Sequence, residues 1–178
     1  MADPLSARAR EVVAVGRRLL EQEGADALTM RRVADELGIR APSLYKHLPN
    51  KAALEAAIIA DGFEEAASAF EAAVDGQREP LRAFVAAYRA FAAAHPHLYR
   101  LMTERPLPRE LLPPGLEARA AAPLVHAVGG PARARAAWAF LHGMTILQLD
   151  ERFPSGESIE PAWQEGLAAF LGTQPRAT

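Results

Sequence analysis

Apolar residues recur every three or four positions along most of the chain, which is the spacing of one face of an α-helix. The segment after Pro80 shows this most clearly, with one stripe formed by Leu81, Phe84, Val85, Tyr88 and Phe91. The alternation of apolar and polar residues that marks a half-buried strand never extends beyond a few positions. The pattern therefore predicts an all-α fold.

Glycines, prolines and capping residues divide this pattern into about nine helices. Gly24 and Gly38 end the first two, Pro49 ends the third, and His95-Pro96 interrupts the pattern again. We expect helices over about 5–23, 30–37, 42–48, 51–74, 80–94, 96–103, 116–128, 131–152 and 159–171. The proline-rich stretch ERPLPRELLPPG reads as a surface loop, and residues 174–178 read as a disordered tail.

The third expected helix, within LGIRAPSLYKHLPNK at residues 37–51, has two unlike sides. At about 100° per residue, Leu44 and Leu48 share one side. The opposite arc carries Ser43, Lys46 and His47, and Tyr45 lies on a flank. One side of this helix is therefore anchored in a core, and the other presents hydrogen-bonding groups to a partner.

The expected helix over 30–37 packs against the third helix through a tight turn. Val33, Ala34 and Leu37 give it an apolar inner face, and small Ala34 lets the next helix approach. Gly38 permits a left-handed turn, and Ile39 fills the corner. Two helices joined in this way form a helix-turn-helix, whose second helix enters the major groove of DNA.

The string LTMRRVADELGIRAPSLYKHLPNKAAL resembles the N-terminal domain of the tetracycline-repressor (TetR) family of bacterial regulators. The matching positions are Thr29, Val33, Ala34, Leu37, Gly38, Ile39, Ser43, Leu44, Tyr45, His47, Lys51 and Leu54. Leu48 departs from the pattern, because many members have an aromatic residue there. The resemblance implies an all-helical homodimer with a DNA-binding head, residues 1–51, and a ligand-binding and dimerisation body, residues 52–173.

The residue types in the head suit contacts to DNA. Tyr45, His47 and Lys51 can each donate to a phosphate oxygen, and helix N-termini follow Thr29 and Asn50. Arginine side chains prefer guanine, whereas alanine can meet only a thymine methyl group. The expected DNA-binding residues are Thr29, Arg31, Arg40, Ala41, Pro42, Ser43, Tyr45, Lys46, His47 and Lys51.

Two helices near the C-terminus predict a homodimer. The helix after Pro131 is apolar on two sides, so it needs cover from its own core and from a partner. Gly143 in mid-helix would allow close approach of another backbone. The expected interface residues are Leu141, His142, Thr145, Leu149, Trp163, Leu167 and Phe170. The string WAFLHG also resembles the Trp/His-Gly subgroup of TetR C-terminal domains.

Aromatic and flexible residues on the middle helices are candidates to line a ligand pocket, although such stripes are often plain core. These candidates are Phe84, Tyr88, Phe91, Tyr99, Met102, Trp138, Phe140 and Met144. Because no arginine or lysine cluster follows residue 51, the expected ligand is largely apolar with a few polar anchors. We expect no metal or other cofactor, and we interpret His95, His97, His126 and His142 as structural or surface residues.

Composition and charge exclude only a few functional classes. The formal net charge is -2, but residues 1–51 carry nine basic and seven acidic side chains, which is compatible with a small DNA-binding module. The absence of cysteine excludes disulfides, thiolate metal sites and a cysteine nucleophile. No long apolar run predicts a membrane span or a signal peptide, so a cytoplasmic location is expected.

The leading hypothesis is a transcriptional repressor that a small ligand releases from a pseudo-palindromic DNA operator. The expected partners are double-stranded DNA, a second copy of the chain and an unidentified small molecule, with no membrane. A ligand-independent or activating DNA-binding protein is the alternative. An enzyme is disfavoured, because the sequence has no nucleophile elbow, phosphate-binding glycine loop or HExxH motif.

Overall fold

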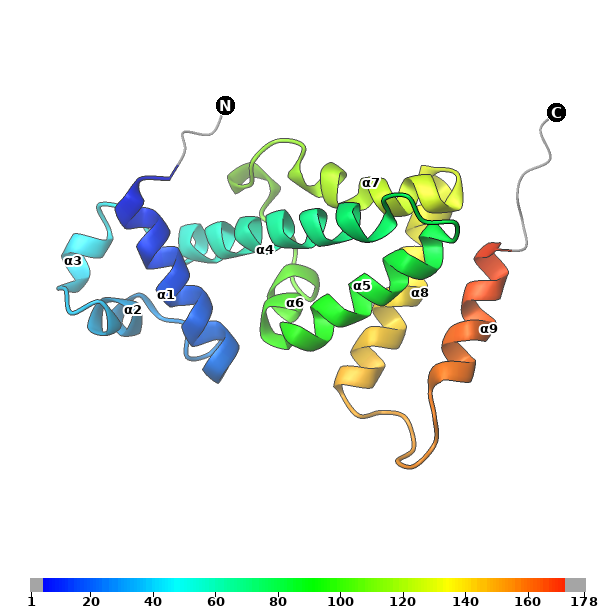
Figure 1. Ribbon diagram of the computed structural model, residues 1–178. Helices are drawn as coiled ribbons and strands as arrows, with labels where there is room; N and C mark the ends of the chain where they lie inside the picture. Colours follow the sequence, from blue (N-terminus) through cyan, green and yellow to red (C-terminus); the bar gives the residue numbers. More distant parts are fainter. Residues whose placement is uncertain (1–4, 172–178) are drawn as a thin grey trace. The chain divides into compact units, whose positions relative to one another are not determined.

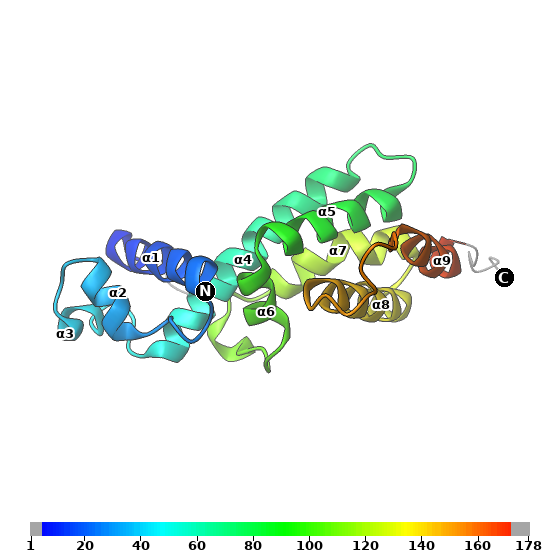
Figure 2. The same ribbon diagram turned by 90° about the horizontal axis from the view of Figure 1, so that it is seen from below.

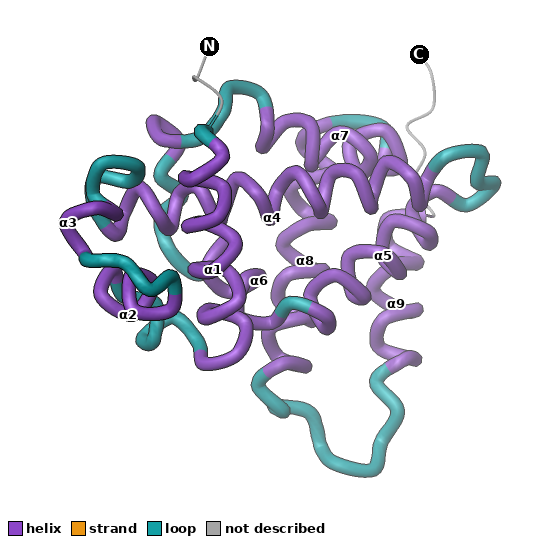
Figure 3. The backbone as a smooth tube through the Cα atoms, turned by 60° about the vertical axis from the view of Figure 1, so that its left-hand side comes forward, coloured by secondary structure: helices purple, strands orange, loops and turns teal. Residues whose placement is uncertain are grey.

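The computed structural model describes residues 5–171, and this part of the chain contains helices and loops but no strand (Figure 3). The elements in chain order are α1 (Ala7–Glu23), α2 (Met30–Glu36), α3 (Ala41–Leu44), α4 (Lys51–Val74), α5 (Pro80–Ala94), α6 (Pro96–Thr103), the 3₁₀ helix η1 (Arg109–Leu111), α7 (Leu116–Val128), α8 (Pro131–Leu149) and α9 (Glu160–Leu171) (Figure 1). The predicted all-α fold is confirmed. Residues 174–178, the predicted tail, lie outside the described residues.

α3 and α8 end three or more residues earlier than the sequence pattern predicts. α3 stops at Leu44, and the chain continues as a turn in which His47 N–H donates to the Leu44 carbonyl at 2.9 Å. Pro49 disfavours helical geometry in Leu48, so the chain does not resume the helix before the proline. α8 stops at Leu149 because Glu151 adopts a left-handed conformation, with φ of 52°.

The described chain divides into two compact units. Unit one comprises the residues up to Ala66 together with Ala94–Glu117, and unit two comprises Ala67–Ala93 together with the residues from Ala118 onward. α4 begins in the first unit and ends in the second. No helix in the described part of the chain is long and apolar enough to cross a membrane.

Unit one packs α1, α2 and α3 around one apolar core (Figures 1 and 2). Its fully buried side chains include Val12, Leu19, Leu20, Leu28, Val33, Leu44, Leu54, Ile58 and Leu98. α6 packs against α1, and it approaches α4 closely at Gly62. A Cβ at Gly62 would lie 2.8 Å from the Met102 sulfur, so glycine permits this contact.

Unit two has an aromatic core and a helix pair. The ring of Phe70 on α4 lies 4.8 Å from Phe84 and 6.0 Å from Tyr88, both on α5. α8 and α9 lie side by side, joined by the loop that precedes Glu160 (Figure 1). The Phe140 ring packs edge-on against buried Trp163 at 5.7 Å, and the Arg89 guanidinium of α5 stacks 4.5 Å from the Trp163 ring centre.

Candidate nucleic-acid interface

The turn between α2 and α3 fixes the orientation of the second helix. Thr29 caps α2, where its hydroxyl accepts the N–H of Arg32 at 3.2 Å. Gly38 takes φ of 64°, a left-handed conformation that favours glycine. The next N–H, that of Ile39, donates back to the Ala34 carbonyl at 3.0 Å. Sequence and geometry therefore agree on a helix-turn-helix.

α3 and the turn after it have one buried side and one exposed side. Leu44 is fully buried, and Leu48 is also buried. Ser43, Lys46 and His47 are exposed, and so is Tyr45, at 48 %. The predicted division of this segment into an anchored side and a polar side matches this placement. An exposed tyrosine among polar groups has its hydroxyl available to a partner.

The first turn of α4 adds a further donor next to α3. The side chain of Asn50 caps the helix by accepting the Ala53 N–H at 2.8 Å. Lys51 lies beside Glu55, with 3.5 Å between the ammonium nitrogen and a carboxylate oxygen. Its side chain is 42 % exposed, so the ammonium group can reach a phosphate oxygen from the helix N-terminus.

The remaining predicted DNA-binding residues also lie at the surface of unit one. Arg31 is 89 % exposed, and its Nε lies 4.0 Å from a carboxylate oxygen of Asp35. Arg40 and Pro42 are exposed, while Ala41 is half-buried. Thr29 is exposed, and its hydroxyl oxygen already accepts a hydrogen bond from the Arg32 N–H in the α2 cap. The ten predicted residues thus come from α2 and its cap, the turn before α3, α3 itself, the turn after α3 and the start of α4.

The helical spacing of the sequence did not predict the ion pairs that join α1 and α2. Both guanidinium nitrogens of Arg32 contact Glu23 at the end of α1, at 2.6 and 2.7 Å. These hydrogen bonds lower the pKa of Glu23 and raise the pKa of Arg32. Arg18 of α1 likewise pairs with Glu36 of α2 at 2.9 Å. Pairs between different helices leave no mark on the spacing within one helix, so the sequence pattern could not reveal them.

Comparison with protein families decides the assignment. Residues 12–58 match the model of the bacterial regulatory proteins of the tetR family, and residues 81–170 match a tetracyclin repressor-like C-terminal domain. The chain belongs to the TetR family. The predicted resemblance is therefore confirmed, and the protein is a helix-turn-helix transcriptional regulator.

Individual relatives agree with this assignment. An uncharacterised HTH-type transcriptional regulator, Rv0681 of Mycobacterium tuberculosis, is 27% identical over 160 residues, which cover 84% of this chain and 73% of the relative. The class G tetracycline repressor protein of Vibrio anguillarum is 46% identical over 43 residues, covering 24% of this chain and 20% of that protein. High identity in this short match is confined to a segment of head size.

Solved structures confirm the fold. A protein of unknown function from Rhodococcus sp. RHA1 has a TM-score of 0.75 at 23% identity, with 96% of each chain covered. BioQ bound to its natural double-stranded DNA operator has a TM-score of 0.64 at 21% identity, covering 94% of this chain and all of that chain. At such identities the likeness concerns the fold of this TetR-family chain.

The residues predicted to line a ligand pocket occupy three kinds of position. Phe84, Tyr88 and Phe91 are buried in the aromatic core of unit two, around Phe70. Tyr99 and Met102 are buried in unit one. Trp138 is 46 % exposed, and Phe140 and Met144 are half-buried. The structure therefore gathers Phe84, Tyr88 and Phe91 around a common neighbour, Phe70.

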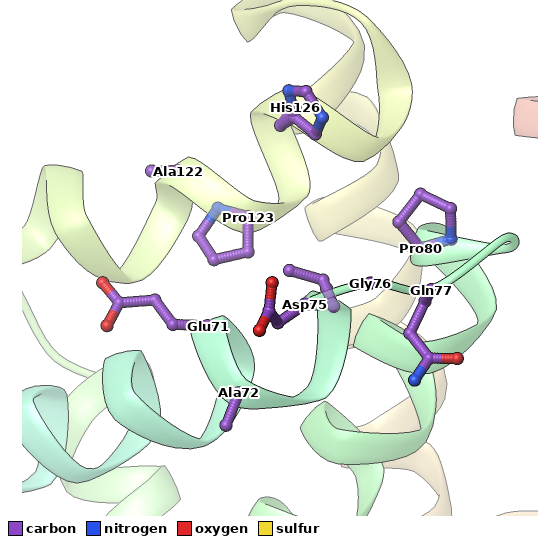
Figure 4. A pocket seen from close by; sticks show the side chains of 10 residues that line it. Glu71, Ala72, Asp75, Gly76, Gln77, Pro80, Ala122, Pro123 and His126 are labelled. Carbon is purple, nitrogen blue, oxygen red and sulfur yellow. The ribbon is translucent and has the colours of Figure 1, made fainter.

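A hollow of about 790 Å³ lies elsewhere in unit two, between the end of α4, the α4–α5 loop and α7 (Figure 4). Its lining residues are Glu71, Ala72, Val74, Asp75, Gly76, Gln77, Pro80, Ala122, Pro123 and His126. Figure 4 shows the carboxylates of Glu71 and Asp75 on the α4 side and Pro123 on the α7 side. None of the eight predicted pocket residues lines this hollow, because an aromatic pattern along one helix cannot locate a space between two others.

The predicted dimer residues are largely core residues of one chain. Leu141, Thr145, Trp163 and Leu167 are buried within unit two. His142, Leu149 and Phe170 are half-buried, and His142 stacks on Trp138 with 5.5 Å between ring centres. The sequence correctly indicated two apolar sides of α8, but the side with Leu141 and Thr145 is the one that covers the subunit's own core.

The opposite side of α8 is apolar and open. Ala136, Ala139 and Leu147 are exposed, and Gly143 lies between them at the helical spacing. A Cβ at Gly143 would meet nothing within 4 Å in the single chain. A second helix can therefore approach the backbone of α8 at this position.

Histidines and carboxylates form no metal site among residues 5–171, where no group of three such side chains has metal-binding geometry. Instead, His126 lines the hollow, and His97 lies near Gly24. His95 contacts Glu21 and Glu65. Each histidine thus has a distinct environment.

Proposed function

We propose that this TetR-family regulator is a repressor that binds a pseudo-palindromic operator as a homodimer. The observation that supports this most directly is the exposed polar side of α3 and its turn, with Ser43, Tyr45, Lys46 and His47, held by buried Leu44. Such a side matches the major groove in shape and chemistry. In the proposal, residues 1–51 form the DNA-binding head, and the chain acts on DNA in the cytoplasm.

Within the head we assign two kinds of contact. Thr29, Tyr45, Lys46, His47 and Lys51 contact phosphate and set the register on the duplex. The base edges are read by Arg31, Arg40, Ala41, Pro42 and Ser43. The first group should govern overall affinity, and the second should govern sequence preference.

The dimer places two such heads on one duplex. We propose that the open side of α8, with Ala136, Ala139, Gly143 and Leu147, packs against its copy in a second chain together with α9. Two recognition helices would then lie about 34–36 Å apart, one turn of DNA. The half-buried residues His142, Leu149 and Phe170 would border this contact.

A small, largely apolar ligand in the body, residues 52–173, would release the operator. A ligand can shift the dimer to a non-binding arrangement only if it binds that arrangement more tightly. The absence of an arginine or lysine cluster after residue 51 supports a largely apolar ligand. Activation of transcription, or ligand-independent binding, is the second candidate, and a catalytic role is not part of the proposal.

Fluorescence anisotropy against duplexes tiled across the upstream region of its gene tests the proposal. Titrations at about 50 and 200 mM salt separate specific binding from the phosphate contribution. Nanomolar binding of one duplex, with a clear gap over its shuffled version, would establish an operator. Equal and weak binding of every duplex, abolished at the higher salt, would contradict the repressor proposal.

Matched variants then locate the surface. Lys51→Ala should weaken binding to all duplexes and reduce the salt slope by about 1, because it removes one phosphate contact. Arg152→Ala removes the same charge from the exposed loop before α9 and should leave affinity unchanged. Equal losses in both variants would show that net charge, and not this surface, governs binding. Compounds that reduce binding of the identified duplex would then be sought as ligands.

A further inference from the structure

His95 joins three segments of unit one. It precedes α6 directly, as the residue at its N-cap position. Its Nδ1 lies 3.1 Å from a carboxylate oxygen of Glu21 on α1, and its Nε2 lies 3.0 Å from a carboxylate oxygen of Glu65 on α4. The three side chains are 27%, 20% and 41% exposed, so the contacts are only partly open to water.

Both ring nitrogens are therefore within hydrogen-bond distance of a carboxylate. A carboxylate in its ionised form can only accept, and a neutral imidazole carries a single N–H donor. Neutral His95 can satisfy one of the two contacts, and its bare nitrogen then faces the oxygens of the other. Only the imidazolium, with two N–H donors, satisfies both contacts at once.

Other charged groups surround the pair of contacts. On α1, Arg17 donates to Asp61 at 2.5 Å and also to Glu65, both on α4. Burial opposes the charge on Arg17, but these hydrogen bonds outweigh it and raise the pKa of the guanidinium. His97, on α6 itself, lies near Gly24, the residue that follows α1.

The charge balance of this cluster depends on His95. Arg17 supplies one positive charge against three carboxylates, those of Glu21, Asp61 and Glu65. Among these five side chains, a proton on His95 brings the formal charge from −2 to −1. Protonation of His95 therefore both completes the hydrogen bonds and reduces like-charge repulsion.

We propose that His95 is a proton-operated clamp that ties the start of α6 to α1 and α4. When the imidazole is protonated, it bridges Glu21 and Glu65. When it is neutral, one of the bridges opens. α1 packs against α2 in the head, so the clamp would make DNA binding respond to pH, a consequence that rests on the proposed function.

The direction follows from the linkage of protonation to stability. Histidine changes its charge between about pH 5 and 8. Because both bridges need the proton, the clamp contributes stability only while the proton is bound, and that contribution is lost when a rise in pH removes it. The opposite slope would require a bridge that favours the neutral ring.

Long-range ¹H–¹⁵N spectra of the full chain test the clamp directly. At about pH 5.5, near the acidic end of the histidine window, two ring N–H signals of His95 should be visible and slow to exchange with water. Glu21→Gln should remove the protection of one signal, and Glu65→Gln should remove that of the other. A single protected ring N–H at this pH, or protection that survives both variants, would overturn the proposal.

Urea unfolding at about pH 5.5 and 8 supplies a second readout. The midpoint of the wild type should fall at the higher pH by more than that of His95→Gln, which cannot be protonated. His97→Gln is the matched control and should retain the wild-type difference. Equal pH responses of wild type and His95→Gln would overturn the proposal even if the variant were less stable overall.

The link to DNA is tested separately, with a duplex of random sequence in the absence of an operator. If the ratio of affinities at the two pH values differs between wild type and His95→Gln, the clamp acts on DNA binding. If the spectra show the clamp but the two ratios agree, the link to DNA is wrong while the clamp stands. If neither protein binds this duplex or any duplex tiled across the upstream region, the proposed function fails independently of the clamp.

Discussion

Gly62 marks the tightest approach between α4 and α6. A Cβ there would lie 2.8 Å from the Met102 sulfur and 3.1 Å from both methyl carbons of fully buried Leu98. Overpacking of this kind costs about 1–3 kcal/mol, against about 1 kcal/mol gained from replacing glycine within a helix. We expect Gly62→Ala to destabilise the protein by about 1 kcal/mol in urea unfolding.

A second substitution shows whether the cost comes from this contact. In the background of Met102→Ala, which removes the sulfur, Gly62→Ala should cost less than half as much. An unchanged cost in that background would mean that the contact with α6 does not explain the glycine.

The ion pair between Glu23 and Arg32 should make the stability of the protein depend on pH in the acidic range. Two hydrogen bonds from Arg32 lower the pKa of Glu23. The pair therefore stabilises the folded state above the ordinary carboxyl pKa, and this contribution is lost as the pH falls through the lowered pKa. Wild type and Glu23→Gln should differ in urea midpoint near neutral pH and converge in acid. A difference that persists unchanged in acid would contradict this assignment.

At the scale of single residues, the sequence predicted which positions of the third helix are buried, because the helical period alone separates Leu44 from Ser43 and Lys46. It predicted nothing of Arg32 with Glu23, or of His95 with Glu21 and Glu65. Those contacts depend on how separate helices pack, and no local pattern encodes that packing.

At the scale of elements, helix boundaries were predicted best where a capping side chain marks them. α4 begins at Lys51, as predicted, because the side chain of Asn50 accepts the Ala53 N–H at 2.8 Å. Where a boundary depended on backbone strain, as at Glu151 after α8, the predicted end was three residues late. The start of a helix that has a capping side chain can thus be predicted from the sequence more accurately than an end that has none.

The Asn50 cap gives a prediction for α4. Asn50→Ala should cost about 1 kcal/mol of stability, because it leaves a donor of the first turn without its partner. Asn50→Asp retains an acceptor and should stay close to wild type. Urea unfolding of the three proteins at neutral pH measures the difference. Equal losses in both variants would show that the amide group matters for another reason, such as a contact of its nitrogen.

At the scale of the whole molecule, the sequence predicted a helix-turn-helix followed by further helices. It did not predict which side of α8 faces the core. Trp138, Leu141 and Leu147 are all apolar, and apolar character alone does not say which chain covers each of them. Leu141 is fully buried in the single chain, whereas Trp138 and Leu147 are 46% and 41% exposed. Trp138 and Leu147 lie on opposite sides of α8, and the side with Leu147, Gly143 and Ala139 is the candidate association surface.

Leu147→Glu therefore separates the proposed dimer from a monomer. A carboxylate at this position remains in water in a single chain but would be buried without a partner in the interface, at a cost of several kcal/mol. Sedimentation equilibrium should show a dimer for the wild type and a monomer for Leu147→Glu. Leu111→Glu, at a 50% exposed leucine of η1, is the matched control and should remain dimeric.

The same pair of variants connects assembly to DNA. One head reads one half-site, so monomeric Leu147→Glu should lose most of the preference for an operator over its shuffled version while keeping weak, salt-sensitive binding. Leu111→Glu should bind as the wild type does. A monomeric variant with full operator preference would show that a single head suffices, and a dimeric Leu147→Glu would move the interface to another face of the body.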